Sequence, residues 1–219
     1  MKHFSLAVVI ILLSIFTKVL FYRLTHKSFK SMRDMQALQP KMAELRVKYK
    51  NNPQKMNQET AALYKREGVN PLGGCLPLLL QLPIFFALYN LLNTHFELRG
   101  ALFIPAWIPD LSAPESVLDF GFSIPLVNWT SLRLLPLIML GTQLLSGKIT
   151  QPPGSDQTGG TQMKLMTYAM PIVFLFILYD MPSGLVLYWT VQNVLSILQQ
   201  MYTNSRRRGA EETGQGKGK

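Results

Sequence analysis

The chain has 219 residues, of which 48% are hydrophobic and only 16% are charged. Its apolar residues fall in long blocks, which excludes an ordinary soluble domain and predicts an all-α polytopic membrane protein with five transmembrane helices. The single cysteine, Cys75, excludes an internal disulfide and cannot make a zinc site alone. The formal net charge of +10 would suit nucleic acid or anionic lipid, but in a membrane protein the placement of charge matters more than its total.

Residues 1–22 are predicted to form the first transmembrane helix. The apolar run 4–22 is long enough to cross a bilayer, and its polar members are Ser5, Ser14, Thr17 and Lys18. A charge near the centre of such a helix costs about 2.5–3.5 kcal/mol on insertion scales, so Lys18 either lines a water-filled cavity or extends its side chain to the interface near Arg23. A cleaved signal peptide is the alternative, but no small-x-small cleavage pattern follows, and we favour a retained helix.

Residues 23–75 are predicted to form a helical hairpin, with Asn51, Asn52 and Pro53 at its turn. Apolar residues recur at the spacings of three and four that are typical of a two-helix coiled coil. In the first arm these are Met35, Leu38, Met42, Leu45 and Tyr49, and Met56 and Leu63 continue the pattern in the second arm. Pro40 should kink the first arm because it removes a backbone donor.

Charge sets the predicted orientation. Residues 23–75 contain eleven Lys or Arg against four acids, whereas residues 96–131 contain one Arg against four acids. The positive-inside rule therefore puts the hairpin in the cytoplasm and the N-terminus outside.

The rest of the chain alternates between apolar blocks and polar loops. A second transmembrane helix is predicted at 76–95, with Gln81 and Pro83 inside it, followed by an extracytoplasmic loop at 96–131 whose Trp107 and Trp129 suit a membrane interface. A third helix at 132–147 is short and has Arg133 near its start. A cytoplasmic loop at 148–162 then leads to the fourth helix.

The fourth and fifth transmembrane helices are predicted at 163–180 and 184–202. The short joint 180–184 contains proline and glycine, which favours an antiparallel pair. The basic tail 203–219 contains Arg206, Arg207 and Arg208 and is predicted to be unstructured and cytoplasmic.

Enzymatic motifs are absent from the sequence. His3, His26 and His95 fall in different segments, and neither a metalloprotease helix, nor a nucleophile elbow, nor a phosphate-binding loop is present. We therefore predict no enzyme activity and no cofactor. A catalyst of partitioning, a channel or a passive scaffold remain as functions.

Polar residues within the apolar blocks recur at helical spacing. Trp189, Gln192, Ser196 and Gln199 share one face of the last block, and Ser14 and Lys18 share a face of the first. One prediction is a hydrated cavity around Lys18, and the alternative is that these side chains join helices by hydrogen bonds. The candidate groove residues are Lys18, Ser14, Thr17, Gln81, Gln143, Trp189, Gln192 and Ser196, with Ser146 beside Gln143.

Three segments resemble the YidC/Oxa family of membrane protein insertases. They are LQPKMAELRVKYKNNPQKMNQETAALYKREGVNPLGG at 38–74, NPLGGCLPLLLQLPIFFALYNLL at 70–92 and PSGLVLYWTVQNVLSILQQ at 182–200. The resemblance runs in order over about residues 10–202. It implies a five-helix core with a cytoplasmic hairpin and a hydrophilic groove open to the cytoplasm and to lipid.

The resemblance also implies roles for single positions. Bacterial members usually carry an arginine in the groove where this chain has Lys18, which keeps the charge but loses the planar fork of a guanidinium. Ser14 matches a position where a related protein has a threonine, and Trp189 matches an aromatic position that meets substrates. The additional N-terminal span and periplasmic domain of Gram-negative members, and the lipoprotein signal of Gram-positive ones, are not seen here, so we expect a trimmed core or a short relative.

The function implied by the resemblance is insertion and folding of nascent membrane proteins in the bacterial inner membrane without nucleotide hydrolysis. The implied partners are nascent substrates, the ribosome, the Sec translocon and the lipid bilayer, with Arg206, Arg207 and Arg208 as contacts for ribosomal RNA. The alternatives are an ion or solute transporter or channel, since a charge in a wet cavity suits an ion pathway, and a scaffold that docks ribosomes.

Overall fold

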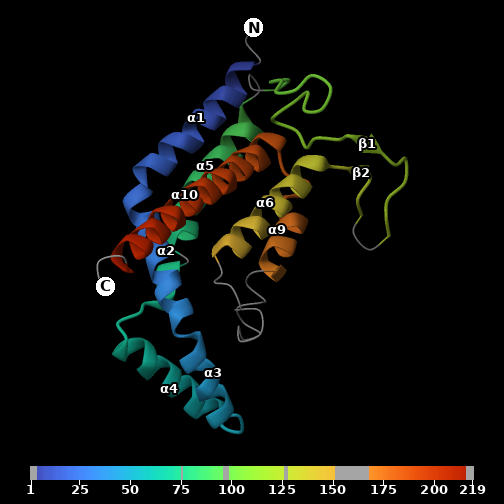
Figure 1. Ribbon diagram of the computed structural model, residues 1–219. Coiled ribbons are helices and arrows are strands. Elements are labelled where there is room, and N and C mark those ends of the chain that lie inside the picture. Colours follow the sequence, from blue (N-terminus) through green and yellow to red (C-terminus); the bar gives the residue numbers. More distant parts are fainter. Residues whose placement is uncertain (1–3, 75, 96–98, 126–127, 151–167, 216–219) are drawn as a thin grey trace.

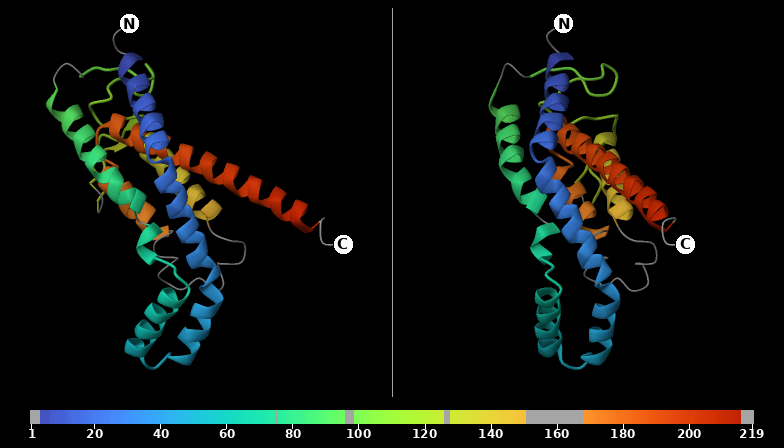
Figure 2. Two further views of the ribbon diagram at one scale, coloured as in Figure 1. Left: turned by 90° about the vertical axis from the view of Figure 1, so that its left-hand side faces the viewer. Right: turned by 60° about the vertical axis from the view of Figure 1, so that its left-hand side comes forward.

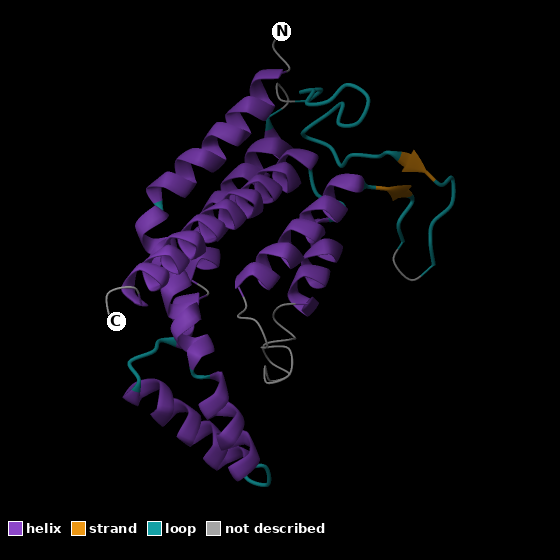
Figure 3. Ribbon diagram, viewed as in Figure 1, coloured by secondary structure: helices purple, strands orange, loops and turns teal. Residues whose placement is uncertain are grey.

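Helices make up most of the structure, a computed structural model that describes residues 4–74, 76–95, 99–125, 128–150 and 168–215. The helices in chain order are α1 (Phe4–Leu20), α2 (Tyr22–Ala37), α3 (Gln39–Lys48), α4 (Pro53–Arg66), the short 3-10 helix η1 (Pro71–Gly74), α5 (Leu76–Thr94), α6 (Leu134–Thr150), α9 (Met170–Leu178) and α10 (Ser183–Gln215). Two short antiparallel strands, β1 (Leu118–Asp119) and β2 (Ser131–Leu132), lie in the long loop between α5 and α6 (Figure 3).

The helices form one bundle with α10 at its centre. α10 contacts α1, α5 and α6, and α6 in turn contacts α9. The long loop lies at the end of the bundle where α1 begins, and α3 and α4 project from the opposite end (Figures 1 and 2). The two ends of the bundle therefore differ in what covers them.

The first predicted transmembrane helix, 1–22, is shorter in the structure and leads into a bend. α1 ends at Leu20, and the chain turns by 66° into α2. The hydroxyls of Ser14 and Thr25 each donate to the carbonyl four residues earlier, a bond that favours helix bending.

The other predicted membrane helices correspond to helices of the structure with shifted bounds. Within the described part of the chain, α5 is long and apolar enough to cross a membrane, α1 with α2 passes the same test only as a bent pair, and α6 is apolar but shorter. The predicted helix 163–180 lies partly outside the described residues and contains α9. The number of five transmembrane helices thus stays a prediction.

The predicted unstructured tail is wrong for most of its length. α10 continues without a break to Gln215. The stretch 204–215 contains three Arg, two Glu, one Ala and one Gln, which favour a helix, although its two glycines do not.

α3 and α4 form a helical hairpin inside the range 23–75 that was predicted for one, while α2 occupies the first part of that range. The chain breaks at Leu38 and α3 begins with Pro40 in its first turn, as expected for proline. The Asn52 side chain caps α4 by accepting a hydrogen bond from the Lys55 N–H. Leu38, Met42 and Leu63 are buried between the arms.

An ion pair closes the open end of the hairpin. Lys41 Nζ lies 2.6 Å from Glu67 Oε1, and this hydrogen bond and charge hold the pKa of Glu67 below its usual value. The pair is exposed, so it contributes little to folding stability.

Two glycines let η1 pack directly against α2. A Cβ on Gly73 would lie 2.5 Å from Ser31 Oγ, and one on Gly74 would lie 2.9 Å from Met32 Cγ. Ser28 and Ser31 donate hydrogen bonds to the carbonyls of Gly73 and Asn70. The GG pair of the sequence therefore serves a close approach between η1 and α2.

The hydrophobic core lies at the loop end of the bundle. Its fully buried members include Ile10, Leu92, Ile108, Leu111, Met139, Leu185 and Tyr188. They come from α1, α5, the long loop, α6 and the first turns of α10, so this end is closed by packed side chains.

The first turn of α10 is fixed to the long loop by backbone hydrogen bonds. The N–H groups of Ser183 and Gly184 donate to the carbonyls of Ala113 and Leu111 at 2.9 and 2.8 Å, and Ser183 Oγ donates to the Asp110 carbonyl at 2.8 Å. These bonds satisfy donors that a helix N-terminus otherwise leaves unpaired.

Glu115 fixes the loop to the start of α6. Its buried carboxylate accepts hydrogen bonds from the Trp107 indole N–H and the Leu135 backbone N–H. A carboxylate at a helix N-terminus is stabilised by the helix dipole. Trp107, predicted from its position to lie at an interface, thus has a protein partner.

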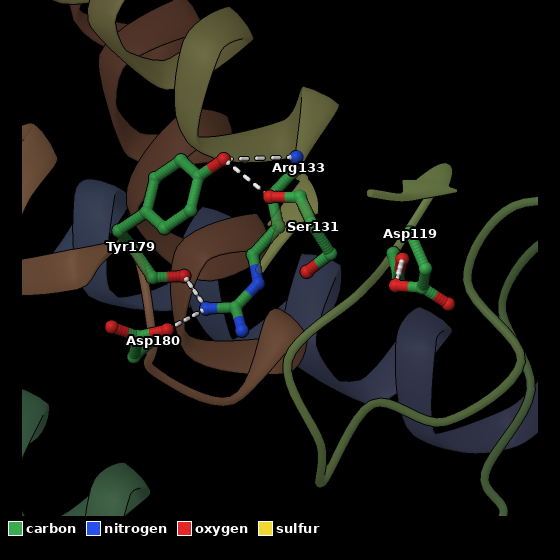
Figure 4. A network of polar contacts seen from close by, with 6 residues as sticks. Asp119, Ser131, Arg133, Tyr179 and Asp180 are labelled. Carbon is green, nitrogen blue, oxygen red and sulfur yellow. Dashed lines mark hydrogen bonds and ion pairs between the residues drawn. The ribbon is translucent and has the colours of Figure 1, made fainter. Parts of the chain in front are cut away.

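A polar network joins the start of α6 to the end of α9 (Figure 4). Arg133 donates to the Tyr179 carbonyl and forms an ion pair with Asp180. The Tyr179 hydroxyl donates to the Ser131 carbonyl at 2.8 Å, and Trp129 stacks on the Tyr179 ring with 3.7 Å between centroids. One nitrogen of the Arg133 guanidinium is therefore paired at the helix end, whereas its buried Nε has no hydrogen-bond partner among the described residues.

The close approach at Gly184 generates a stability prediction. A Cβ there would lie 2.9 Å from the Leu111 carbonyl oxygen and 3.2 Å from methyl groups of Ile10 and Leu92. Gly184→Ala should therefore lower the free energy of unfolding by about 1–3 kcal/mol, measured by thermal unfolding in detergent.

Gly141→Ala in α6 is the matched control, because nothing lies within 4 Å of its Cβ position. This variant should be neutral or slightly stabilising, since alanine favours a helix more than glycine does. Equal losses in both variants would contradict the role of Gly184.

Candidate functional site

A cavity of about 270 Å³ lies on the hairpin side of the hydrophobic core. Its walls come from α1, α2, η1, α5, α6 and α10. Of the residues predicted from the sequence, it brings together Thr17, Lys18, Gln81, Gln143, Ser146, Trp189, Gln192 and Ser196. These residues, which were grouped from the sequence alone, therefore lie around a single cavity.

Lys18 projects from α1 toward α10. Its Nζ donates to Ser196 Oγ at 2.6 Å, and Ser196 Oγ donates to the Gln192 carbonyl at 2.8 Å. No carboxylate is found among the described residues that line the cavity. The ammonium group thus has a neutral partner in this space.

Gln192 fits both alternatives for the polar residues, a cavity lining and a hydrogen-bonded contact between helices. It lines the cavity, and its amide also donates to Thr17 Oγ1 at 2.7 Å and to the Ser14 carbonyl at 3.1 Å. A hydrogen-bonded glutamine between α1 and α10 joins the two helices at the depth of Lys18.

The side-chain amides of Gln81 and Gln143 each have one atom without a hydrogen-bond partner in the described part of the chain. Gln81 Nε2 and Gln143 Oε1 are buried and have no hydrogen-bond partner among the described residues. Buried polar atoms are normally paired with protein or water, so both atoms favour a hydrated cavity.

Ser14 does not line the cavity as predicted. It is fully buried, and its hydroxyl donates to the Ile10 carbonyl at 2.8 Å. A separation of four residues leaves Ser14 rotated by about 40° from Lys18 around the helix axis, which is enough to turn it into the contact with α10.

Gln199, predicted on the same face as Gln192 and Ser196, also lies outside the cavity lining. Its neighbour Gln200 lines the cavity instead, and the Gln199 amide is buried without a partner among the described residues. Spacings of four residues, at 192, 196 and 200, follow the face of α10 that borders the cavity.

Three further polar residues line the cavity that the sequence did not single out: Thr25, Asn193 and Gln200. Thr25 lies beyond the bend after α1, in a segment assigned to the hairpin. Because that segment contains many polar residues, the sequence did not distinguish Thr25 from its neighbours.

Aromatic side chains separate the cavity from the core. Trp189 lines the cavity and packs edge-on against Phe85 and at a tilt against Phe174, with centroids 5.8 and 5.0 Å apart. The next residues toward the start of α10 are buried. Trp189 therefore marks the floor of the cavity.

The outer surface of the bundle is apolar around this polar interior. Exposed residues on α1, α5 and α9 include Leu12, Phe16, Val19, Leu79, Phe86, Ile172 and Phe176. Such large apolar surfaces suit contact with lipid. Among the described residues, no group of His, Cys, Asp or Glu is placed to hold a metal ion.

Comparison with known proteins identifies the family. The pattern of the 60Kd inner membrane protein family matches residues 1–211. The chain belongs to this family. The membership confirms the resemblance to insertases of the YidC type and the assignment to the bacterial inner membrane.

Several relatives of this family are named membrane protein insertase YidC. The relative from Treponema denticola is 53% identical over 197 residues, 90% of this chain and 34% of that protein. The relative from Treponema pallidum is 49% identical over 194 residues, 89% of this chain and 31% of that protein. The chain thus spans about a third of the length of the curated relatives it matches.

A solved structure has the same fold. It is described as an active YidC insertase crystal structure with the first transmembrane domain resolved. It matches with a TM-score of 0.62 and 26% identity, over 90% of this chain and 41% of that chain.

The polar lining of the cavity generates a labelling prediction. In a Cys75→Ser background, Ser196→Cys should react with a small charged methanethiosulfonate in liposomes, because its thiol would face water and Lys18, and a nearby cation favours the thiolate. The rate of labelling is measured by mass spectrometry.

Leu198→Cys is the control on the same helix, since Leu198 is 56% exposed on the apolar surface. In a bilayer this thiol should face lipid and react at least about tenfold more slowly, because a thiol in apolar surroundings stays protonated. Similar rates at both positions would argue against a hydrated cavity.

Proposed function

We propose that this chain inserts nascent membrane proteins into the bacterial inner membrane and helps them fold, using the cavity around Lys18 and no nucleotide hydrolysis. The observation that carries the proposal is the gathering of polar side chains from α1, α5, α6 and α10 around one ammonium group, inside helices with apolar outer surfaces. The names of the relatives, membrane protein insertases, support it.

The proposed mechanism lowers the cost of moving polar groups through hydrocarbon. A peptide group without a hydrogen-bond partner costs several kcal/mol in an apolar medium. The Gln81, Gln143 and Gln192 amides and the Ser196 hydroxyl offer partners part-way across the bilayer. The hydrophilic tail of a substrate would therefore meet a lower barrier along this cavity than in lipid.

Lys18 would attract acidic residues of that tail. An ion pair about 4 Å apart gains about 4 kcal/mol at an effective dielectric constant of about 20. The hydrogen bond from Lys18 to Ser196 is to a neutral oxygen, so a substrate carboxylate would not have to displace an acidic partner. Apolar substrate segments would leave along the lipid-facing side, driven by hydrophobic transfer.

The proposed orientation puts the N-terminus outside and α10's C-terminal end in the cytoplasm, with five transmembrane helices in all. The hairpin of α3 and α4 and the far end of α10 lie on the side of the bundle away from the N-terminus (Figure 2), and the hairpin region carries the excess of Lys and Arg. The cavity would then open toward the cytoplasm, and the packed core would close it outside.

The ribosome and the Sec translocon are proposed as partners. Arg206, Arg207 and Arg208 lie on α10 in its extension beyond the bundle, where a contact to ribosomal RNA should weaken with salt. The hairpin is the proposed receiving surface for substrates or partners.

Reconstitution tests the function against its two alternatives. Purified protein in liposomes should accelerate insertion of a short single-span substrate with an acidic translocated tail. Ion or solute flux without insertion would identify a transporter or channel, and ribosome binding without insertion would identify a docking scaffold.

Variants of Lys18 test the proposed role of the charge. Lys18→Arg should retain insertion, whereas Lys18→Ala should slow insertion of acidic-tailed substrates about tenfold, equivalent to about 1.4 kcal/mol. Substrates with neutral tails should be affected less by Lys18→Ala. Equal rates in all three proteins would remove Lys18 from the mechanism.

A further inference from the structure

A second, smaller hollow of about 30 Å³ adjoins the cavity on the hairpin side. Its lining residues come from α2, the end of α6 and α10, and they are Phe29, Arg33, Ile149, Gln200, Thr203 and Asn204. Phe29 and Gln200 line the cavity as well. The hollow is therefore continuous with the mouth of the cavity.

Arg33 supplies the charge of this hollow. No acidic residue lines it, and no hydrogen bond or ion pair links the Arg33 guanidinium to the described part of the chain. The charged side chains next to the lining in sequence, Lys30, Asp34 and Lys148, are all exposed. Arg33 is half-buried, so its charge is directed to a confined space.

The lining chemistry fits a carboxylate. A guanidinium offers two parallel N–H donors that match the two oxygens of a carboxylate. The Asn204 amide adds a further donor at the rim, while Phe29 and Ile149 form an apolar wall.

The positions of Lys18 and Arg33 suggest the order in which an incoming chain would meet them. Lys18 lies in α1 at the depth of Gln192, and Arg33 lies beyond the 66° bend, in the part of α2 that leads to the hairpin. A chain that arrives from the hairpin side therefore passes Arg33 before it reaches Lys18.

We propose that Arg33 forms a first binding site for acidic residues of an incoming chain, from which they move on to Lys18. This inference rests on the proposed insertase function. It adds a specificity-determining residue at the mouth of the cavity, in a segment whose residue pattern did not indicate one.

Photo-crosslinking tests the order of the two sites. A photoreactive residue at Asn204 reports on the hollow and one at Asn193 on the cavity, since each lines its own space. With stalled nascent chains of increasing length and one acidic residue in the tail, crosslinks from position 204 should appear at shorter lengths than those from 193. A photoreactive residue at Met201, exposed and outside both linings, is the control.

Rates of insertion test the charge. Arg33→Gln should slow an acidic-tailed substrate about threefold at low salt, which is the size of a partly exposed ion pair, and the difference should shrink near 1 M salt. A neutral-tailed substrate should be unaffected. Lys30→Gln, an exposed lysine of α2 that lines neither space, should leave both rates unchanged.

Each other outcome overturns the inference in a recognisable way. Equal slowing of acidic and neutral tails would give Arg33 a structural role, and a loss that appears only in vesicles with anionic phospholipid would make the hollow a headgroup site. Crosslinks from 204 that appear no earlier than those from 193 would remove the order of use. Failure of the unsubstituted protein to insert any substrate would instead overturn the proposed function itself.

Discussion

The hydrogen bond from the Gly184 N–H to the Leu111 carbonyl fixes where α10 begins, and the rest of the bundle depends on that point. Gly184 also lies against Ile10 of α1 and Leu92 of α5, so the absence of a side chain sets how closely three elements approach. α10 then contacts α1, α5 and α6 from this fixed start. The depth of every polar residue on α10 is thereby set relative to the other helices.

From that start, α10 supplies one half that is buried in the core and one half that borders the polar cavity. The residues just after Gly184 are buried in the hydrophobic core as far as Trp189, and Gln192, Ser196 and Gln200 then follow at spacings of four along the cavity. A charge is costly in a closed apolar interior and much less so beside water. Lys18 lies on the polar side of the floor that Trp189 forms, where its charge would cost less than in the core.

Much of the site was predictable because polar residues are conspicuous in apolar blocks. Gln81, Gln143 and Lys18 stood out for this reason, and helical spacing grouped Gln192 with Ser196. Ser14 and Gln199 were misassigned because helical spacing defines a face only approximately. The packing of neighbouring helices decides which side chains on that face are buried in a contact and which line the cavity. Thr25 and Arg33 were missed because the segment after residue 22 is polar throughout, and a further polar residue there carries no signal.

The fold was predictable to a similar degree. The hairpin followed from its apolar spacing and from Pro40 and Asn52, which act locally. Two contacts join residues far apart in the chain: Arg133 with Tyr179, and Glu115 with the start of α6. Local sequence patterns do not predict such pairs. The extension of α10 to Gln215 was missed because a polar composition was read as disorder, although the same residues favour a helix.

The packing of η1 against α2 has a mechanical consequence. Ser28 and Ser31 hold the carbonyls of Gly73 and Asn70, so the chain entering α5 is braced against the chain leaving α1. The hairpin of α3 and α4 begins beyond this brace, with Leu38 at one root and Gly68, at a positive φ of 66°, at the other. A rotation of the hairpin about those two ends would leave the contact of η1 with α2 intact, so the hairpin can change its position without changing the walls around Lys18.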